Sequence, residues 1–259
     1  MRIAIVGASG RMGRTIVRLA SGAGEEVVCA IAVADVGRDV GELAGIGPNG
    51  VCIVDGLGAL EHARADVVID FSSPHATLAL APIVAAAGTA IVSGTTGLQE
   101  EARAALAEAA TRVPVLWEPN MSLGVHVLSQ VVARAVAALP GWDVEIVEVH
   151  HHSKVDAPSG TALRLAEVVR SARASETRLV HGRHGKPGAR GSGEVGMHAL
   201  RGGDVVGDHV VHLMGGGERL ELGHRATSRD VFAYGAVRAA RWIVGKPPGT
   251  YALADLLGG

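Results

Sequence analysis

Aromatic side chains are scarce in this sequence, since Phe, Tyr and Trp together make up 3% of its residues. A hydrophobic core must therefore be built mainly from Ala, Val, Leu and Ile, which suits helices packed on buried parallel strands. Cysteine is limited to Cys29 and Cys52, both in apolar runs where we expect them to be buried. The sequence contains no CxxC pair and no disulfide framework, which favours a reducing, cytoplasmic compartment.

Charge of one sign is not in excess either, because 24 Lys and Arg stand against 26 Asp and Glu. This balance gives no electrostatic basis for binding nucleic acid or an anionic membrane. The most apolar stretch, LALAPIVAAAGTAIV from Leu78 to Val92, is interrupted by Pro82 and Gly88, so we expect no membrane span. The first residues run into the strand-like segment IAIVG without the pattern of a signal peptide. We therefore expect a soluble, cytoplasmic protein that binds neither nucleic acid nor a membrane.

Short β-branched runs alternate with helical patterns in the first half of the chain. The expected strands are Ile3–Val6, Val27–Ala32, Val51–Val54, Val67–Phe71, Ala90–Ser93 and Val113–Trp117. The expected helices between them are Arg11–Ser21, Leu57–Ala63, Pro74–Ala87 and Glu100–Thr111. Strands that alternate with helices predict a doubly wound parallel sheet.

The pattern changes after Glu118. The expected helices there are Leu123–Ala138, Thr161 to about Ala172, and Asp230–Val244, and the expected strands are Val144–Val149, Val195–Leu200, His209–Met214 and Arg219–His224. Gly clusters separate the last three strands, which favours antiparallel pairing. Residues 181–193, rich in Gly and basic side chains, are expected to form a loop. The predicted fold class is α/β, with an N-terminal Rossmann-type doubly wound parallel sheet and a second α+β domain.

A glycine-rich loop, GASGRMG from Gly7 to Gly13, joins the first expected strand to the first expected helix. In a Rossmann unit the first glycine permits a tight turn and the second lets backbone N–H groups approach a pyrophosphate. The third lets helix and strand pack closely, and the helix N-terminus adds partial positive charge. Because the motif stands between a strand and a helix, as its function requires, it predicts dinucleotide binding.

An acidic residue that would hold the adenosine ribose is expected at the end of the second strand, about 20 residues after the glycines. This sequence has Val33 there, and Asp35 comes slightly late. Either the loop bends Asp35 back or the ribose is held differently. Arg11, Arg14 and Arg38 are close enough in sequence to serve a 2′-phosphate, although each taken alone is expected to be a solvated surface arginine. The choice between NADH and NADPH therefore stays open.

The segment VHHHSKVDAPSGTA, residues 149–162, concentrates functional groups and supports three interpretations. A zinc site requires converging ligands, but adjacent histidines on an extended segment point to alternate faces, so at most two of the three converge. A structural polar loop is the simplest interpretation for any single histidine, and we prefer it for His152. The third interpretation is a site for an anionic small molecule.

Three features of this segment favour the anion site. Lys154 supplies a cationic donor, and imidazoles give or take protons near neutral pH. Gly160 and Thr161 open a helix, whose N-terminal N–H groups and the Thr161 hydroxyl would form a nest for a carboxylate. Asp156 is interpreted as an internal partner that fixes the loop. Together these groups predict an enzyme with a carboxylated small-molecule substrate and no metal.

With these residues in place, the chain resembles the dihydrodipicolinate reductase family, whose activity is that of a 4-hydroxy-tetrahydrodipicolinate reductase. The pattern E-x-H-H-x-x-K-x-D-A-P-S-G-T-A from Glu148 to Ala162 carries the resemblance most specifically. Further matching segments are GASGRMG at 7–13, VIDFSSP at 68–74, SGTTG at 93–97, PNMSLGV at 119–125, RGGDVVGDH at 201–209, GERLELGHRATSR at 217–229 and FAYGAVRAARW at 232–242.

The resemblance implies two domains: residues 1–119 and 229–259 as a dinucleotide-binding domain, and residues 120–228 as a substrate-binding and oligomerisation domain of a homotetramer. It implies reduction of 4-hydroxy-tetrahydrodipicolinate, a cyclic dicarboxylate, by NADH or NADPH in diaminopimelate and lysine biosynthesis. His150 would be the proton donor or acceptor and Lys154 a proton donor. Substrate carboxylates would be bound by Lys154 with His151, Gly160 and Thr161. The cofactor residues would be Gly7, Ala8, Ser9, Gly10, Arg11, Met12, Gly94, Thr95, Thr96, Glu118, Pro119, Asn120 and Met121.

The sequence departs from the family pattern at two places. Val33 and Ala34 stand where an acidic residue and often an arginine are usual, which puts cofactor preference in question. Glu118 stands where a small neutral residue is usual. A carboxylate beside the nicotinamide would stabilise its oxidised, positively charged ring, so Glu118 would affect cofactor affinity.

Three rival hypotheses keep parts of the pattern. Another Rossmann-type reductase would act on a different carboxylated imine or sugar, but a sugar enzyme would not need Lys154 with the Gly160–Thr161 nest. A nucleotide sensor without turnover would need neither His150 nor Lys154. A metal-binding protein would use the three histidines, and metal analysis of the purified protein distinguishes it.

Overall fold

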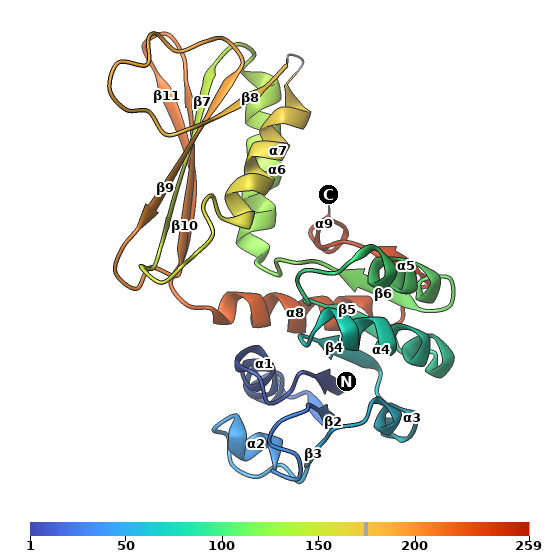
Figure 1. The fold of residues 1–259 in the computed structure, drawn as a ribbon. Coiled ribbons are helices and arrows are strands. Elements are labelled where there is room, and N and C mark those ends of the chain that lie inside the picture. The colour runs from blue at the N-terminus through green and yellow to red at the C-terminus, as the bar shows by residue number, and fades with distance from the viewer. Residues whose placement is uncertain (174–175, 259) are drawn as a thin grey trace. The chain divides into compact units, whose positions relative to one another are not determined.

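The computed structural model describes residues 1–173 and 176–258 and divides into two compact units. Unit 1 comprises Met1–Ser122 and Asp230–Gly259, and unit 2 comprises Leu123–Arg229 (Figure 1). The chain thus leaves unit 1 once and returns to it with its last long helix.

Unit 1 contains a parallel sheet with strand order β12-β6-β5-β4-β1-β2-β3. Its inner order, 3-2-1-4-5-6, is that of a doubly wound Rossmann sheet, whose direction of winding reverses between β1 and β4. The strands are β1 (Arg2–Val6), β2 (Glu26–Ile31), β3 (Ile53–Val54), β4 (Val67–Asp70), β5 (Ala90–Ser93), β6 (Pro114–Trp117) and β12 (Gly249–Tyr251). The predicted fold class is confirmed for this half of the chain.

The helices of unit 1 follow the predicted pattern closely. Helix α4 spans Pro74–Ala87 as predicted, with Ser73 Oγ accepting from the N–H of Ala76 at 3.2 Å, and Gly88 ending it at φ 67°. A serine cap, a first-turn proline and a left-handed glycine explain both ends. The others are α1 (Arg11–Gly22), α2 (Val40–Leu43), the 3₁₀ turn η1 (Leu57–Ala59), α3 (Leu60–Ala63), α5 (Glu100–Ala109), α8 (Asp230–Ile243) and α9 (Leu253–Leu256).

Unit 2 is a mixed five-stranded sheet of order β11-β10-β7-β9-β8. Its strands are β7 (Asp143–His150), β8 (Arg178–His181), β9 (Glu194–Arg201), β10 (Gly207–Met214) and β11 (Arg219–Ala226). Helices α6 (Leu123–Ala138) and α7 (Gly160–Ala172) cover one face of this sheet (Figure 1). Side chains such as Val132, Ile146 and Leu165 fill the space between the two layers and are fully buried.

Two expectations from the sequence were wrong. The run at Val195–Leu200 forms β9, which pairs in parallel with β7 and β8 rather than antiparallel; β10 does pair antiparallel with β7 and β11. The glycine clusters that suggested hairpins precede only the antiparallel pair. Cys52 is exposed because it stands just before the short β3, whereas Cys29 is buried as expected.

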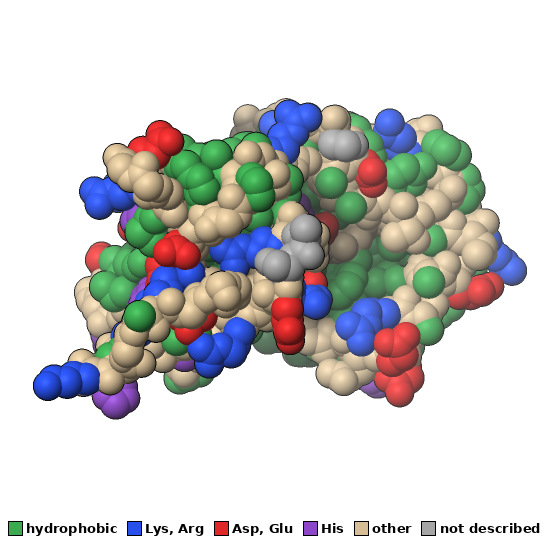
Figure 2. Space-filling model, turned by 90° about the horizontal axis from the view of Figure 1, so that it is seen from above, with side chains coloured by type: hydrophobic (Ala, Val, Ile, Leu, Met, Phe, Trp, Pro, Cys, Tyr) green, Lys and Arg blue, Asp and Glu red, His purple; other side chains and the backbone are tan. Residues whose placement is uncertain are grey.

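The surface charge and the hydropathy of the helices bear on which partners the chain could bind. Figure 2 shows Lys and Arg side chains interspersed with Asp and Glu on the face in view. Within the part of the chain that the structure describes, no helix combines the length and the apolar character needed to cross a membrane.

Candidate active site

Strand β7 brings Glu148 and His150 to the same face of its sheet. Alternate residues of a strand share a face, and Val144, Ile146, Glu148 and His150 are all buried. Val144 and Ile146 pack against α6 and α7, so Glu148 and His150 lie on the helix-covered side at the end of the strand.

Glu148 is 1% exposed and accepts hydrogen bonds from three residues. Nη1 and Nη2 of Arg201 on β9 each donate at 2.8 Å, and the N–H of Ser159 donates at 3.0 Å. Nδ1 of His150 lies 2.6 Å from Oε2. Burial raises the pKa of Glu148, but the hydrogen bonds from Arg201, His150 and Ser159 outweigh burial and hold the pKa below its ordinary value. Glu148 is therefore an anion at neutral pH.

The His150 ring is fixed at Nδ1 and packed on one edge. Its ring and that of His209 on β10 are 5.2 Å apart between centroids, at 75°. Burial lowers the pKa of His209 to about 4, so this neighbour is neutral at pH 7. Gly207 adjoins the other ring nitrogen, because a Cβ built there would lie 2.9 Å from Nε2 of His150.

Lys154 lies in the loop between β7 and α7, where its Nζ donates to Oδ1 of Asp156 at 2.7 Å. The hydrogen bond from Lys154 lowers the pKa of Asp156. The carbonyl of Asp156 accepts from Nη2 of Arg201 at 2.7 Å. Asp156 is thus an internal partner of the loop, as interpreted from the sequence. Through Arg201, this loop is tied to the carboxylate that holds His150.

The three consecutive histidines do not converge. Nε2 of His151 lies 3.3 Å from Nη2 of Arg229, and Nδ1 of His152 lies 3.0 Å from the carbonyl of Gly203. Partial desolvation and the Arg229 cation lower the pKa of His151. His152 is exposed, in agreement with its interpretation as a polar loop residue. In the described ranges, no group of three or more His, Cys, Asp or Glu side chains is arranged to hold a metal ion.

Helix α7 begins at Gly160, one residue before the predicted start, with Ser159 as its N-cap. Ser159 Oγ accepts from the N–H of Ala162 at 3.2 Å and lies 3.0 Å from Nε2 of His209. Gly160 is exposed, and a Cβ built there would meet no atom within 4 Å. The first turn of α7, with Gly160 and Thr161, therefore borders open space, toward which a helix N-terminus directs partial positive charge.

In unit 1, two glycines shape the turn between β1 and α1. Gly7 has φ 84° and lies against the carbonyl of Phe71, where a Cβ would come within 2.3 Å. A Cβ on Gly13 would come within 2.2 Å of the carbonyl of Gly7. These contacts place the loop at the β1–β4 switch point, where doubly wound sheets bind ligands.

The N–H groups of this turn are not equivalent. Those of Gly7 and Ala8 donate to the carbonyl of Ile31 at 2.8 and 3.0 Å, and that of Gly10 donates to Gly7 at 3.0 Å. The first turn of α1, with Arg11 and Met12, carries the N–H groups that fit a phosphate. The residues present therefore suit the pyrophosphate of a dinucleotide, mainly through Arg11, Met12 and the exposed backbone of Gly10.

The segment Gly94–Thr96 follows β5 beside a buried carboxylate, Asp70 at the end of β4. Asp70 is fully buried and accepts hydrogen bonds from the hydroxyls of Ser72, Thr77, Ser93 and Thr95. The Thr95 side chain therefore points inward, and Thr96 is the exposed residue of the three.

The segment Glu118–Met121 follows β6, and the N–H of Glu118 donates to the carbonyl of Ser93 at 3.0 Å. Glu118 is 6% and Met121 1% exposed, so both side chains lie inside the unit. Asn120 Oδ1 accepts from the N–H of Ser122 at 2.9 Å. Pro119 is the exposed side chain of this segment.

The loop after β2 bends Asp35 back against α1. Nη2 of Arg14 donates to Oδ2 of Asp35 at 2.9 Å, and Nη1 of Arg38 donates to Oδ1 at 3.0 Å. Nε of Arg14 also donates to the carbonyl of Ser9 at 2.7 Å, which links Asp35 to the glycine-rich loop. Of the alternatives that the sequence left open, the structure has the bent-back loop, while Val33 is 94% exposed. Arg14 and Arg38 are ion-paired rather than merely solvated.

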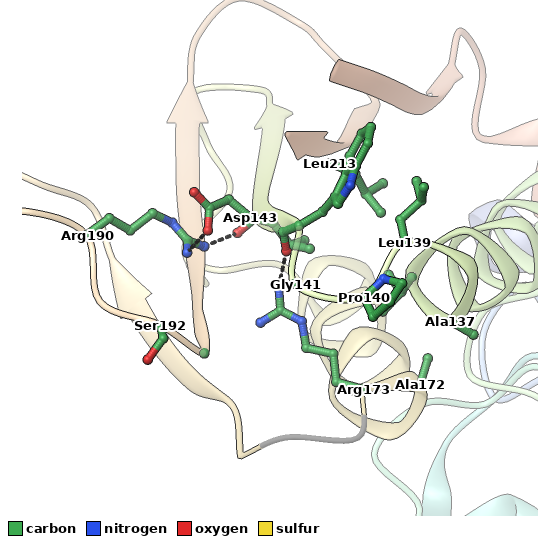
Figure 3. A pocket seen from close by; sticks show the side chains of 14 residues that line it. Ala137, Leu139, Pro140, Gly141, Asp143, Ala172, Arg173, Arg190, Ser192 and Leu213 are labelled. Carbon is green, nitrogen blue, oxygen red and sulfur yellow. Dashed lines mark hydrogen bonds and ion pairs between the residues drawn. The ribbon is translucent and has the colours of Figure 1, made fainter. Parts of the chain in front are cut away.

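A cavity of about 570 Å³ lies in unit 2, near the start of β7 (Figure 3). Arg173 and Arg190 on its wall are already bound to protein acceptors: Arg173 donates to the Trp142 carbonyl at 2.9 Å, and Arg190 to Asp143 at 2.5 Å. None of the predicted site residues is among the described residues that line it. We therefore place the candidate site at the other end of β7, around His150.

Sequence reasoning missed the contributions of Glu148, Arg201 and His209. Glu148 lies on the predicted strand Val144–Val149 and His150 directly follows that strand, so their shared face was available from the period of two if the strand is extended by one residue. An acid on the buried face of a strand, next to a histidine, is the signal that identifies the pair. Arg201 and His209 come from strands that only the fold brings alongside.

A doubly wound sheet with a glycine-rich loop at its switch point, and a second unit with a carboxylate-held histidine near a lysine, define a Rossmann-type nicotinamide-dependent oxidoreductase. Two family models of the same enzyme match consecutive parts of the chain. The family model described as "Dihydrodipicolinate reductase, N-terminus" matches residues 1–121, and that described as "Dihydrodipicolinate reductase, C-terminus" matches residues 124–257.

Relatives named 4-hydroxy-tetrahydrodipicolinate reductase match along the whole chain. The protein from Myxococcus xanthus is 51% identical, over 100% of this chain and 98% of the relative. The protein from Archaeoglobus fulgidus is 47% identical, over 99% and 100%. A solved dipicolinate-bound dihydrodipicolinate reductase from a Paenisporosarcina species matches with a TM-score of 0.81 at 25% identity, over 99% of both chains. The chain belongs to the dihydrodipicolinate reductase family, and it is an oxidoreductase that uses NADH or NADPH.

Proposed function

We propose that this protein reduces 4-hydroxy-tetrahydrodipicolinate to tetrahydrodipicolinate with NADH or NADPH, a step of diaminopimelate and lysine biosynthesis. The observation that carries the proposal is the connected set of Lys154, Asp156, Arg201, Glu148 and His150 in unit 2. It supplies a cation and an oriented imidazole in the unit that also contains the start of α7. A cyclic dicarboxylate needs such groups both to be bound and to be protonated.

Unit 1 holds the dinucleotide in this proposal, which when bound supplies a hydride to the substrate ring. Gly7, Ala8 and Gly10 shape the turn, and Ser9, Arg11 and Met12 face the phosphates. Gly94, Thr95 and Thr96 and the segment Glu118–Met121 bind the nicotinamide end, mainly through backbone groups and the exposed Thr96 and Pro119. We assign dinucleotide binding to unit 1, and substrate binding and oligomerisation to unit 2. Their bounds differ by at most three residues from the predicted domains, residues 1–119 with 229–259 and residues 120–228.

His150 and Lys154 protonate the substrate in this proposal. The 4-hydroxyl leaves as water together with a hydrogen of the neighbouring ring carbon, and the C=C bond that forms is conjugated with the ring imine. Hydride addition to this bond leaves electron density on the neighbouring ring atom, and a cationic group must supply a proton there. Nε2 of His150 gives that proton. Lys154 releases Asp156 and donates a hydrogen bond to a substrate group instead. The substrate carboxylates bind His151, Lys154 and the first turn of α7 at Gly160 and Thr161. The solved relative from Paenisporosarcina is bound to dipicolinate, a planar cyclic dicarboxylate.

The choice of nucleotide depends on Asp35 in this proposal. Its carboxylate neutralises Arg14 and Arg38, two of the three arginines that the sequence offers for a 2′-phosphate. A 2′-phosphate would compete with Asp35 for them, whereas a free 2′-hydroxyl would use Asp35 as an acceptor. We expect Asp35→Asn to raise the ratio of kcat/KM for NADPH to that for NADH several-fold. An unchanged ratio would remove Asp35 from nucleotide selection.

We further propose a cytoplasmic homotetramer. The face of the unit 2 sheet that α6 and α7 leave uncovered carries apolar side chains, among them Leu200, which is 49% exposed. Such a face suits association of sheets from different subunits. Both cysteines are unpaired, consistent with a reducing compartment. Sedimentation at four times the mass of one chain is the expected result, and a monomer at working concentration would contradict it.

The decisive experiment for the activity is a coupled assay. Freshly generated 4-hydroxy-tetrahydrodipicolinate is supplied with NADH and with NADPH in parallel, and oxidation is followed by absorbance. We expect oxidation with at least one nucleotide that depends on substrate and stops when it is exhausted. A protein that binds the nucleotide but oxidises neither form would be a sensor or a reductase of another substrate.

A further inference from the structure

The contacts of Glu148 use its whole hydrogen-bonding capacity. Oε2 accepts from His150 at 2.6 Å and from Arg201 Nη1 at 2.8 Å, and Oε1 accepts from Arg201 Nη2 at 2.8 Å and from the N–H of Ser159 at 3.0 Å. Both oxygens thus have two donors, which is the number that a carboxylate oxygen accepts in its plane. The fork of Arg201 fixes the plane of the carboxylate, because the two parallel hydrogen bonds resist rotation.

This arrangement decides which nitrogen of His150 carries the proton in its neutral form. An ionised carboxylate only accepts, so Nδ1 must donate and the proton must be on Nδ1. Nε2 is then the nitrogen that gains and loses a proton. His209 packs against the ring edge and limits its rotation. Gly207 leaves space beside Nε2, where any side chain would come within 2.9 Å.

The same carboxylate neutralises a positive charge when His150 is protonated. The charged and titratable groups around the Glu148–His150 pair, element by element, are His151, Lys154 and Asp156 in the loop after β7, Arg201 on β9, His209 on β10, His224 on β11, and Arg229 beside His151. Arg201 and Lys154 are cations, and Asp156 offsets Lys154. Without Glu148, an imidazolium at His150 would face these cations with no anion in contact.

We infer that Glu148 is a positioning residue of the active site, which holds His150 in the Nδ1–H tautomer and stabilises its protonated form while Arg201 and Ser159 hold Glu148. This inference rests on the proposed proton-transfer function of His150. Glu148 is 1% exposed and its two oxygens are occupied by His150, Arg201 and Ser159, so we assign it to positioning and not to substrate contact.

The kinetic test compares Glu148→Gln with Glu145→Gln, a control three residues earlier on the opposite face of β7. For Glu148→Gln we expect kcat to fall about ten-fold, less than the full contribution of general acid–base catalysis, because the imidazole itself remains. The KM for the dicarboxylate should change less than about three-fold. The control should keep the wild-type kcat and KM.

A second measurement on the unchanged protein does not depend on a variant that folds. Long-range ¹H–¹⁵N correlation spectra of ¹⁵N-histidine-labelled protein report the tautomer, and the loss of one set of signals in His150→Gln assigns His150. We expect protonated Nδ1 and unprotonated Nε2 in the neutral ring. The reverse tautomer, or a Glu148→Gln enzyme with wild-type kcat, would overturn the inference. Failure of the wild-type enzyme to reduce the dicarboxylate would instead refute the proposed function and leave the tautomer result standing.

Discussion

Two glutamates on β7, Glu145 and Glu148, lie on opposite faces of one sheet and hold similar partners. Glu145 binds Arg183 at 2.8 and 2.9 Å and Nε2 of His198 at 2.7 Å, and Glu148 binds Arg201 and Nδ1 of His150. Each pair is a carboxylate with an arginine fork and an imidazole. The residue types around a glutamate therefore do not by themselves distinguish a catalytic site from a structural one.

The surroundings of the two pairs make the difference. Arg183 and Arg190, which bind Glu145, both come from the loop between β8 and β9, so Glu145 fastens that loop to the sheet. The His198 side chain is 30% exposed, and its Nε2 is bound to Glu145. His150 is 10% exposed, shares its network with Lys154 and has Nε2 beside Gly207. The helix-covered face thus carries the nitrogen to which we assign proton transfer, and the other face carries an anchor for the loop.

The largest effect apart from that of His150 itself is expected for Lys154→Ala. Removing the ammonium takes away both a carboxylate anchor and a proton donor, so kcat should fall about 100-fold while KM for the dicarboxylate rises. Lys186→Ala, in the loop anchored by Glu145, is the control and should leave both constants unchanged. Steady-state kinetics with saturating nucleotide measure this. An equal fall of kcat in Lys154→Ala and Lys186→Ala would contradict the assignment of catalysis to the helix-covered face of the sheet.

A smaller loss of turnover is expected for Gly207→Ala. The added Cβ would lie 2.9 Å from Nε2 of His150, so the ring or strand must shift and kcat should fall about ten-fold. Gly202→Ala, in the β9–β10 connection that precedes Gly207, has no atom within 4 Å of its Cβ and should remain fully active. Wild-type kcat in Gly207→Ala would show that the reacting nitrogen is elsewhere.

On the other face, Glu145→Gln should reduce stability rather than turnover. Burial raises the pKa of Glu145, but the hydrogen bonds from Arg183, His198 and Arg190 outweigh it and lower the pKa to about 2. A carboxyl with a lowered pKa stabilises the fold above its ordinary value of 4.5 and loses that contribution as pH falls toward 2. The variant should lose on the order of 2 to 3 kcal/mol of unfolding free energy at pH 7, measured with urea. The difference from wild type should shrink at pH 3.

The surface pair Glu167–Arg170 on α7 provides the matched control for that measurement. Glu167→Gln removes a glutamate that also holds an arginine, but in an exposed position. Its unfolding free energy should stay close to wild type at both pH values. If the unfolding free energy of Glu145→Gln also stayed close to wild type, the ion pairs of Glu145 would not stabilise the fold.

The smallest effect concerns His209, which packs against His150. Its pKa is lowered to about 4, mainly by burial, and Nδ1 is buried without a hydrogen-bond partner among the described residues. The unfolded chain therefore binds a proton between pH 6.5 and 4 that the folded chain does not, so stability rises with pH in this window. His209→Gln should flatten that slope in urea titrations. His212→Gln, on the opposite face of β10, should leave the slope as in wild type.

The sequence predicted most elements of the fold, because local patterns determine them. Helix Leu123–Ala138 has its predicted bounds since its apolar face repeats at helical spacing and Pro140 follows it. The three-residue β12 and the exposed β8 were missed, because they are too short or too polar for a period to be recognised. The pairing of β9 was wrong because alternation identifies a strand but not its neighbours.

Around His150 as well, local groupings could be predicted from the sequence, whereas contacts between distant segments could not. His150, Lys154 and Gly160 lie within eleven residues of one another, so their grouping was visible in the motif. Arg201 is 53 residues from Glu148, and His209 is 50 residues from Ser159, so only the sheet brings them together. Asp35 required the structure as well, because its return to Arg14 depends on a left-handed backbone at φ 59°.

The central claim is tested most directly by the turnover of His150→Gln and His198→Gln, measured side by side with 4-hydroxy-tetrahydrodipicolinate and the preferred nucleotide. Both histidines contact a glutamate of the same strand, at 2.6 and 2.7 Å. We predict that kcat falls at least about 100-fold in His150→Gln and stays at the wild-type value in His198→Gln. Equal kcat in the two variants would contradict the assignment of proton transfer to the helix-covered face of β7.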